Sequence, residues 1–184
     1  YISTAASPFS DAMAEKALEL IGANIRRYTA NRSDIEAAEN MLVGSLFAGI
    51  AFSWARLGDV HAMSHPVSAF FNVPHGVANA ILLPTIVEYN ALADHGKYFN
   101  IYNYIAPLPA ALEEFTPDML VDAIVELNDS LGIPDGLEEV GVTKDKFDAM
   151  ADDAMKSGNI AVNPRSTTKK DVLALYEKAF SGLE

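Results

Sequence analysis

The chain has 184 residues, of which 50% are hydrophobic and 21% are charged, as is ordinary for a soluble globular protein. This length is sufficient for one domain with a proper hydrophobic core. A formal net charge of -12 at pH 7 excludes the basic face of a nucleic-acid-binding protein and disfavours binding to anionic membranes. Without cysteine the chain has no disulfides, thiolate metal sites or iron–sulfur clusters, in keeping with a cytoplasmic protein.

Nearly every segment has the apolar spacing of an α-helix, and strand patterns are close to absent. Ser10 is expected to cap the first helix, and Ser33 is expected to open a capping box at the head of the second. Thr116 and Thr168 have the same capping role in two later helices, and residues 97–105 form a short aromatic-rich helix. The sequence therefore predicts one all-α domain over residues 1–184, with about seven helices.

The second predicted helix, from residue 33 to about residue 57, is apolar on nearly all of its sides. Such a helix is normally buried, so it is expected to be the central one, with Phe52 and Trp54 in the core. Gly44 on this helix would let a neighbouring helix approach closely. The apolar run over residues 41–55 is shorter than the roughly 20 residues that span a bilayer, so no transmembrane segment is expected.

Three of the four histidines lie close together in the sequence, as His61, His65 and His75. The spacing of His61 and His65 places both on one face of a helix, one turn apart. His75 follows Pro74 at the entrance to the next apolar helix, and a short loop is expected to return it toward the first pair. Because neutral imidazole is a common ligand of zinc and iron, the three could supply up to three ligands of one metal site. A purely structural His61–His65 pair is the competing interpretation, and His95 is expected to be a surface residue at a helix end.

Longer motifs around these histidines resemble the iron-containing (group III) alcohol dehydrogenases. The resemblance is most specific in His61-Ala-Met-Ser-His65-Pro66 and in Asn72-Val-Pro-His75-Gly76-Val-Ala-Asn79-Ala-Ile-Leu-Leu-Pro84. It extends to Ser7-Pro8-x-x-Asp11 near the start and to Asn163-Pro-Arg165-x-x-Thr168 near the end. It therefore covers almost the whole chain.

The resemblance implies a two-domain enzyme with an N-terminal α/β nucleotide-binding domain and a C-terminal helical domain. This chain corresponds to the helical half, and the nucleotide-binding domain is expected to be absent from it. The family's divalent metal, usually iron and sometimes zinc, is held by one aspartate and three histidines. His61 and His75 correspond to two of these ligands, and the other two are expected in a D-x-x-x-H segment before Tyr1.

The resemblance also implies the reaction, which is interconversion of an alcohol and an aldehyde or ketone by hydride transfer with NAD or NADP. His65 corresponds to a histidine that does not bind the metal, lies near the nicotinamide and the substrate, and is credited with proton relay. Phe52 is expected to line the substrate pocket. Ser68 departs from the pattern, since the family commonly has glycine there, and local packing could differ as a result.

Other interpretations remain at this point. Dehydroquinate synthase-like and glycerol dehydrogenase-like metal enzymes resemble this architecture, although the H-A-M-S-H-P segment fits the alcohol dehydrogenases better. A non-catalytic helical module for metal binding or oligomerisation is an alternative of another class. Because two histidines rarely hold a divalent metal tightly, the chain alone is expected to bind iron weakly and to lack dehydrogenase activity. An apolar surface toward the missing domain and homo-oligomer formation are also expected.

Overall fold

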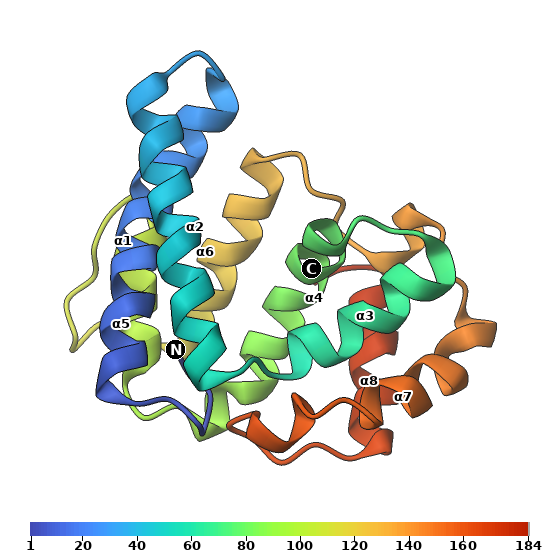
Figure 1. The fold of residues 1–184 in the computed structure, drawn as a ribbon. Coiled ribbons are helices and arrows are strands. Elements are labelled where there is room, and N and C mark those ends of the chain that lie inside the picture. The colour runs from blue at the N-terminus through green and yellow to red at the C-terminus, as the bar shows by residue number, and fades with distance from the viewer. Residues whose placement is uncertain (184) are drawn as a thin grey trace.

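The structure is a computed structural model that describes residues 1–183, and Figure 1 shows it to be built from α-helices. No strand occurs in this part of the chain, so the all-α prediction is confirmed, with eight α-helices where about seven were predicted. The helices are α1 (Pro8–Ala30), α2 (Ile35–Ala55), α3 (Asp59–Phe71), α4 (His75–Asn90), α5 (Lys97–Ile105), α6 (Pro117–Ser130), α7 (Phe147–Met155) and α8 (Lys169–Phe180).

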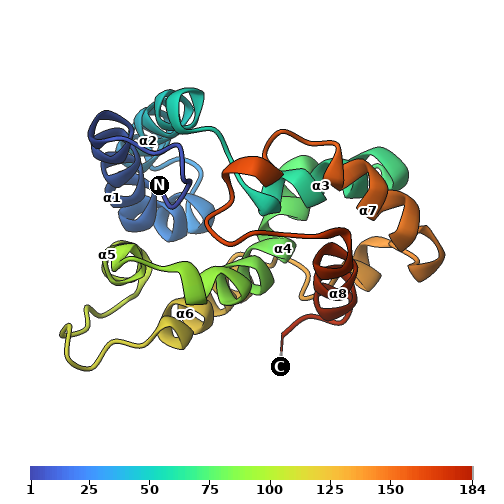
Figure 2. The same ribbon diagram turned by 90° about the horizontal axis from the view of Figure 1, so that it is seen from below.

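The central helix is α4, which contributes to two hydrophobic clusters that lie on its opposite sides (Figures 1 and 2). Leu82 and Ala78 on this helix are completely buried. The larger cluster joins α3 and α4 to α7 and α8, with Met63, Met150 and Tyr176 among its buried members. The smaller cluster joins α4 to α5 and α6. Because α4 supplies side chains to both, it holds the two groups of helices together.

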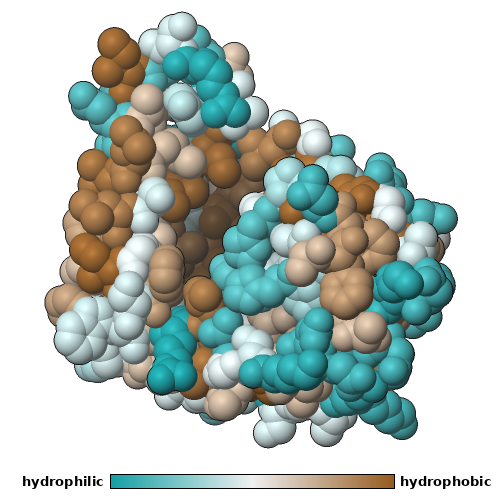
Figure 3. All heavy atoms as spheres, turned by 45° about the vertical axis from the view of Figure 1, so that its right-hand side comes forward, coloured by the Kyte–Doolittle hydropathy of each residue, from teal (hydrophilic) through white to brown (hydrophobic). Residues whose placement is uncertain are grey.

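The prediction that the second helix is central and buried is wrong. α2 packs along α1, and Gly44 permits this approach, since a Cβ there would lie 2.7 Å from Ile21 Cγ1. The rest of its surface has no such neighbour, so Trp54 is 68% exposed and Phe52 is 49% exposed. Figure 3 shows apolar atoms over much of this helical hairpin and around a hollow beside it. An all-round apolar pattern indicates burial, but one partner helix covers only one side.

The expectation from length that the second helix could not span a membrane is also corrected. α2 has 21 residues, and within residues 1–183 it is the one helix that is long and apolar enough to cross a bilayer by length and composition. Only a small part of α2 is buried, and it lies along α1 as half of a helical hairpin. Length and composition alone do not identify it as a membrane span.

The helix caps are partly as predicted. Thr168 caps α8 in a capping box, as expected. The cap of α1 is Ser7 rather than Ser10, because Pro8 occupies the first helical position and Ser10 completes the box three residues later. The cap of α2 is Asp34 rather than Ser33, with the aspartate side chain accepting a hydrogen bond from the backbone in the first turn.

Candidate metal centre

The histidines are presented by two consecutive helices and the turn between them. α3 carries His61 and His65 on its first two turns and ends at Asn72, whose φ of 55° is the left-handed conformation that commonly closes a helix. Pro74 then caps α4, and His75 is the first residue of that helix. The short turn thus brings the start of α4 back toward the face of α3 that carries the other two histidines.

The three imidazole rings form one cluster, as the loop and the helical spacing predict. The ring centroids of His61 and His75 are 5.3 Å apart, and those of His65 and His75 are 5.1 Å apart. His65 and His75 are nearly parallel, with an interplanar angle of 24°, whereas His61 meets both other rings edge-on. The cluster combines a half-buried ring, His61, with two exposed ones.

A single side chain, Asn79, contacts two of these rings. Its amide Nδ2 lies 3.3 Å from Nε2 of His61 and 3.2 Å from Nε2 of His75. Asn79 stands one helical turn after His75, so both point from the same face of α4. The Nε2 atoms of His61 and His75 therefore approach a common point, and His65 has no such contact with Asn79.

Burial gives His61 the uncharged state that a metal ligand requires. Burial, and then the neighbouring His75 and His65, lower the pKa of His61 to about 4. Burial and His75 also lower the pKa of His65. At neutral pH His61 is therefore uncharged, and an uncharged imidazole keeps the lone pair that a metal ion binds.

The three histidines do not form a ready set of three metal ligands. Within residues 1–183 no group of three or more histidine, aspartate or glutamate side chains is arranged to hold a metal ion. The first interpretation, in which all three histidines are ligands of one ion, is therefore not supported by the geometry. The convergence of His61 and His75 on one amide nitrogen suits a pair of nitrogen ligands.

A buried polar network anchors the start of α3, just before His61. Asp59 is the first residue of α3 and is completely buried, and its Oδ2 accepts a hydrogen bond of 2.5 Å from Thr167 Oγ1. The Oδ1 atom of Asn163 accepts from the backbone N–H of Asp59, at 3.3 Å, and from Nδ2 of Asn90, at 3.1 Å. Burial raises the pKa of Asp59 to about 6. The network joins α3, the end of α4 and the loop before α8.

Arg165, in the loop before α8, ties that loop to α4. Nη1 of Arg165 donates a hydrogen bond of 2.7 Å to the carbonyl oxygen of Tyr89 on α4, and its guanidinium lies 3.9 Å from the centre of the Tyr89 ring. The Tyr89 hydroxyl in turn donates to the carbonyl oxygen of Ser166. These contacts hold the loop before α8 against the end of α4.

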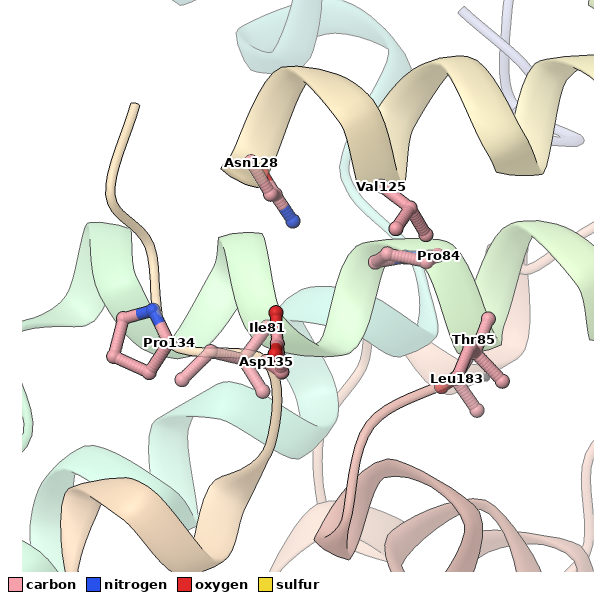
Figure 4. A pocket seen from close by; sticks show the side chains of 8 residues that line it. All are labelled: Ile81, Pro84, Thr85, Val125, Asn128, Pro134, Asp135 and Leu183. Carbon is pink, nitrogen blue, oxygen red and sulfur yellow. The ribbon is translucent and has the colours of Figure 1, made fainter. Parts of the chain in front are cut away.

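Two depressions lie near these helices. A shallow one of about 190 Å³ lies between α3 and α7, and its lining is Ala62, His65, Pro66, Ala69, Asp153 and Ser157. A smaller cavity of about 20 Å³, room for a single water molecule, lies between α4, α6 and the end of the chain (Figure 4). The first gives His65 an open space beside it. Phe52 lines neither depression, and its role at the substrate stays a prediction.

Comparison with known proteins bears on the same region. The model of the Fe-containing alcohol dehydrogenase family, C-terminal, matches residues 1–180. The chain belongs to this family. It is 39% identical over 181 residues to 1,3-propanediol dehydrogenase of Citrobacter freundii and to lactaldehyde reductase of Escherichia coli K12. Each alignment covers 98% of this chain and 47% of the relative.

Solved structures of family members have the same fold. A crystal structure of 1,3-propanediol oxidoreductase superimposes with a TM-score of 0.92 at 38% identity, and alcohol dehydrogenase from Oenococcus oeni with 0.91 at 32%. Both cover 98% of this chain and 47% of the other. The chain thus spans about half the length of these family members and corresponds to the C-terminal part.

Sequence reasoning found the three histidines of this family member but assigned no role to Asn79 or to the Asp59–Asn163 network. Asn79 appeared only within the family motif, and its spacing from His75 was the signal that both share a helix face. Asp59 and Asn163 are 104 residues apart, so their contact had no local signal.

Proposed function

We propose that this chain is the metal-binding helical half of an iron-dependent alcohol dehydrogenase that interconverts an alcohol and an aldehyde or ketone with NAD or NADP. His61 and His75 are two of the metal ligands. The observation that carries the proposal is the approach of both Nε2 atoms to one point, at 3.3 and 3.2 Å from the same nitrogen. Membership of an iron-containing family supports a metal at this place.

His61 and His75 are assigned to metal binding, and His65 is assigned to proton transfer. A bound divalent metal supplies positive charge that lowers the pKa of an alcohol hydroxyl, and a nicotinamide supplies the acceptor of the hydride. His61 and His75 would hold the metal through their Nε2 lone pairs. His65, which is exposed and uncharged when its pKa is lowered, accepts the proton that the hydroxyl loses and passes it to solvent.

The names of the relatives support this reaction class. One is a dehydrogenase of 1,3-propanediol and another is a reductase of lactaldehyde, so the two names describe alcohol oxidation and aldehyde reduction. We extend to this chain the reaction type and no particular substrate. The metal is iron or zinc, because imidazole nitrogen suits both.

The proposal assigns the remaining parts of the enzyme to protein outside this chain. An α/β nucleotide-binding domain supplies the cofactor site and the other two metal ligands, and Phe52 contributes to the substrate pocket. Residues 1–184 form one helical domain of that enzyme, which is a cytoplasmic homo-oligomer without nucleic-acid or membrane partners. The exposed apolar side chains of α2 support burial of this surface in the larger protein.

The first experiment measures metal content and NAD(P)H-linked alcohol oxidation in the longer protein that contains this chain. His61→Ala and His75→Ala are expected to lose both metal and activity, because each removes a ligand. His65→Ala is expected to retain the metal and lose most of the rate. His95→Ala, an exposed histidine outside the cluster, is the matched control.

The outcomes separate the proposal from its alternatives. Full metal occupancy in both His61→Ala and His75→Ala would contradict the ligand assignment. Metal binding without any alcohol-dependent reduction of NAD or NADP would indicate a lyase of the dehydroquinate synthase type or a non-catalytic module. A protein that contains no nucleotide-binding domain would also favour the non-catalytic module.

A further inference from the structure

We propose that Asn79 is a positioning residue of the His61–His75 metal site. In the metal-free protein its amide NH₂ group bridges the two ring Nε2 atoms, and a bound metal ion displaces it from them. This inference rests on the proposed function, which makes the two histidines metal ligands. It adds a residue that orients the two ligand nitrogens in the metal-free protein and moves away from them when the ion binds.

The hydrogen-bond geometry assigns the protons. An amide NH₂ group has two hydrogens, and the two Nε2 atoms lie within hydrogen-bond distance of the same Nδ2. Each imidazole accepts one of the hydrogens, so each ring carries its own proton on Nδ1. The lone pairs of both Nε2 atoms then point inward to the amide nitrogen. These are the tautomers in which His61 and His75 can bind one ion together.

The distances resemble those between ligands of one metal ion. With bonds of about 2.0–2.1 Å from zinc to imidazole nitrogen, two ligands of a tetrahedral site lie about 3.3 Å apart. The amide nitrogen of Asn79 lies 3.3 Å from Nε2 of His61 and 3.2 Å from Nε2 of His75. It therefore has the spacing of a third ligand. Once an ion takes the two lone pairs, the NH₂ group has no acceptor there and must turn away.

The carbonyl oxygen of the Asn79 side chain does not restrain rotation of the amide group. Oδ1 of Asn79 is buried and has no hydrogen-bond partner, so the head group is held only by the two histidines. Rotation about the Cβ–Cγ bond breaks no further hydrogen bond, and it turns the carbonyl oxygen toward the cation. Asn79 is also on the same α4 face as His75, which keeps its head group within reach of the site throughout.

The metal-free part of the inference is tested by nitrogen NMR of the imidazole rings in the 184-residue chain, in the presence of a chelator. We expect Nδ1–H tautomers for His61 and His75 in the wild type. Asn79→Leu, which keeps the volume without the NH₂ group, should give mixed tautomers at both rings, while His95 is unchanged. Unprotonated Nδ1 and protonated Nε2 in both wild-type rings would overturn the bridging role.

The displacement part is tested by titrating Zn²⁺ into the same chain and its variants. We expect the side-chain NH₂ resonances of Asn79 to move together with the His61 and His75 imidazole resonances. Asn79→Leu should raise the Zn²⁺ dissociation constant about tenfold, in the range for residues that orient ligands. Asn79→Asp should lower it about tenfold, because a carboxylate oxygen would take the position of a third ligand.

Failure of this inference is distinguishable from failure of the proposed function. Equal Zn²⁺ dissociation constants for the wild type, Asn79→Leu and Asn79→Asp, with both imidazoles still responding, would overturn the role of Asn79 and leave the two ligands in place. Zn²⁺ that moves neither imidazole, or that moves His95 equally, would overturn the metal site itself. The tautomers of the metal-free chain would then still decide whether Asn79 bridges the rings.

Discussion

The buried carboxyl group of Asp59 makes stability depend on pH in an unusual direction. It is completely buried at the start of α3, its Oδ1 has no hydrogen-bond partner, and burial raises its pKa from the usual 3.8 to about 6. Between these two values the folded protein keeps a proton that the unfolded chain has released. The stabilising contribution of Asp59 is therefore full below about pH 3.8 and is lost as the pH rises through 6.

The size of this effect follows from the shift in pKa. A change of about two units at about 1.4 kcal/mol each makes roughly 3 kcal/mol, with no reduction for solvent exposure because the residue is buried. Asp59→Asn removes the titrating group. Relative to the wild type, the variant should gain roughly 3 kcal/mol in free energy of unfolding between pH 4 and pH 7, most of it below pH 6.

The assay is urea unfolding of the metal-free chain followed by circular dichroism at several pH values. Subtracting the wild-type free energy from that of Asp59→Asn cancels other groups that titrate in this range. Asp129→Asn, at an exposed position, is the matched control. A difference between Asp59→Asn and the wild type that is equal at pH 4 and pH 7 would refute the reasoning.

Three further predictions concern stability. The pKa of His61 is lowered from 6.5 to about 4, so the protein should lose stability as the pH falls from 6.5 through 4. The loss should be roughly 2 kcal/mol, below the full value of the shift because solvent screens a half-buried ring, and His61→Gln should abolish it in urea titrations. A persistent loss would contradict it. Gly22→Ala should cost about 3 kcal/mol in thermal or urea unfolding, because a Cβ would overlap the carbonyl oxygen of Tyr104. Gly49→Ala, which meets no atom within 4 Å, should instead stabilise by about 1 kcal/mol, and equal effects would show the packing argument to be wrong. Tyr176→Phe removes the buried 2.7 Å hydrogen bond to the carbonyl oxygen of Met63 and should cost about 1–3 kcal/mol, and an unchanged unfolding midpoint would count against it.

Much of the helical architecture was predictable because its signals are local. The short helix over residues 97–105 and the cap of α8 at Thr168 were both predicted correctly. The cap of α1 was misplaced although Pro8 marked the first helical position, since proline is favoured immediately after the cap. The burial of α2 could not be predicted, because its apolar pattern does not say which sides meet another helix.

In the candidate site, too, the features set by local sequence were predictable and the contacts between helices were not. The spacing of His61 and His65 predicted a shared helix face, and Pro74 predicted the turn that returns His75. The family resemblance already implied that His61 and His75 act as a pair and that His65 is separate, but the geometry of that division depends on the crossing of α3 and α4. Nothing in the local sequence indicated that one amide would contact both members of that pair.

By itself the sequence determined the helices, the family and the three histidines, because helix propensity, capping and motif spacing act over a few residues. The tertiary structure decided the rest. It made α4 rather than α2 the central helix, placed Asn79 between His61 and His75, and buried Asp59 against a loop more than a hundred residues away. These outcomes depend on packing between distant segments, which sets burial and ring orientation and therefore the pKa values and contacts of the site.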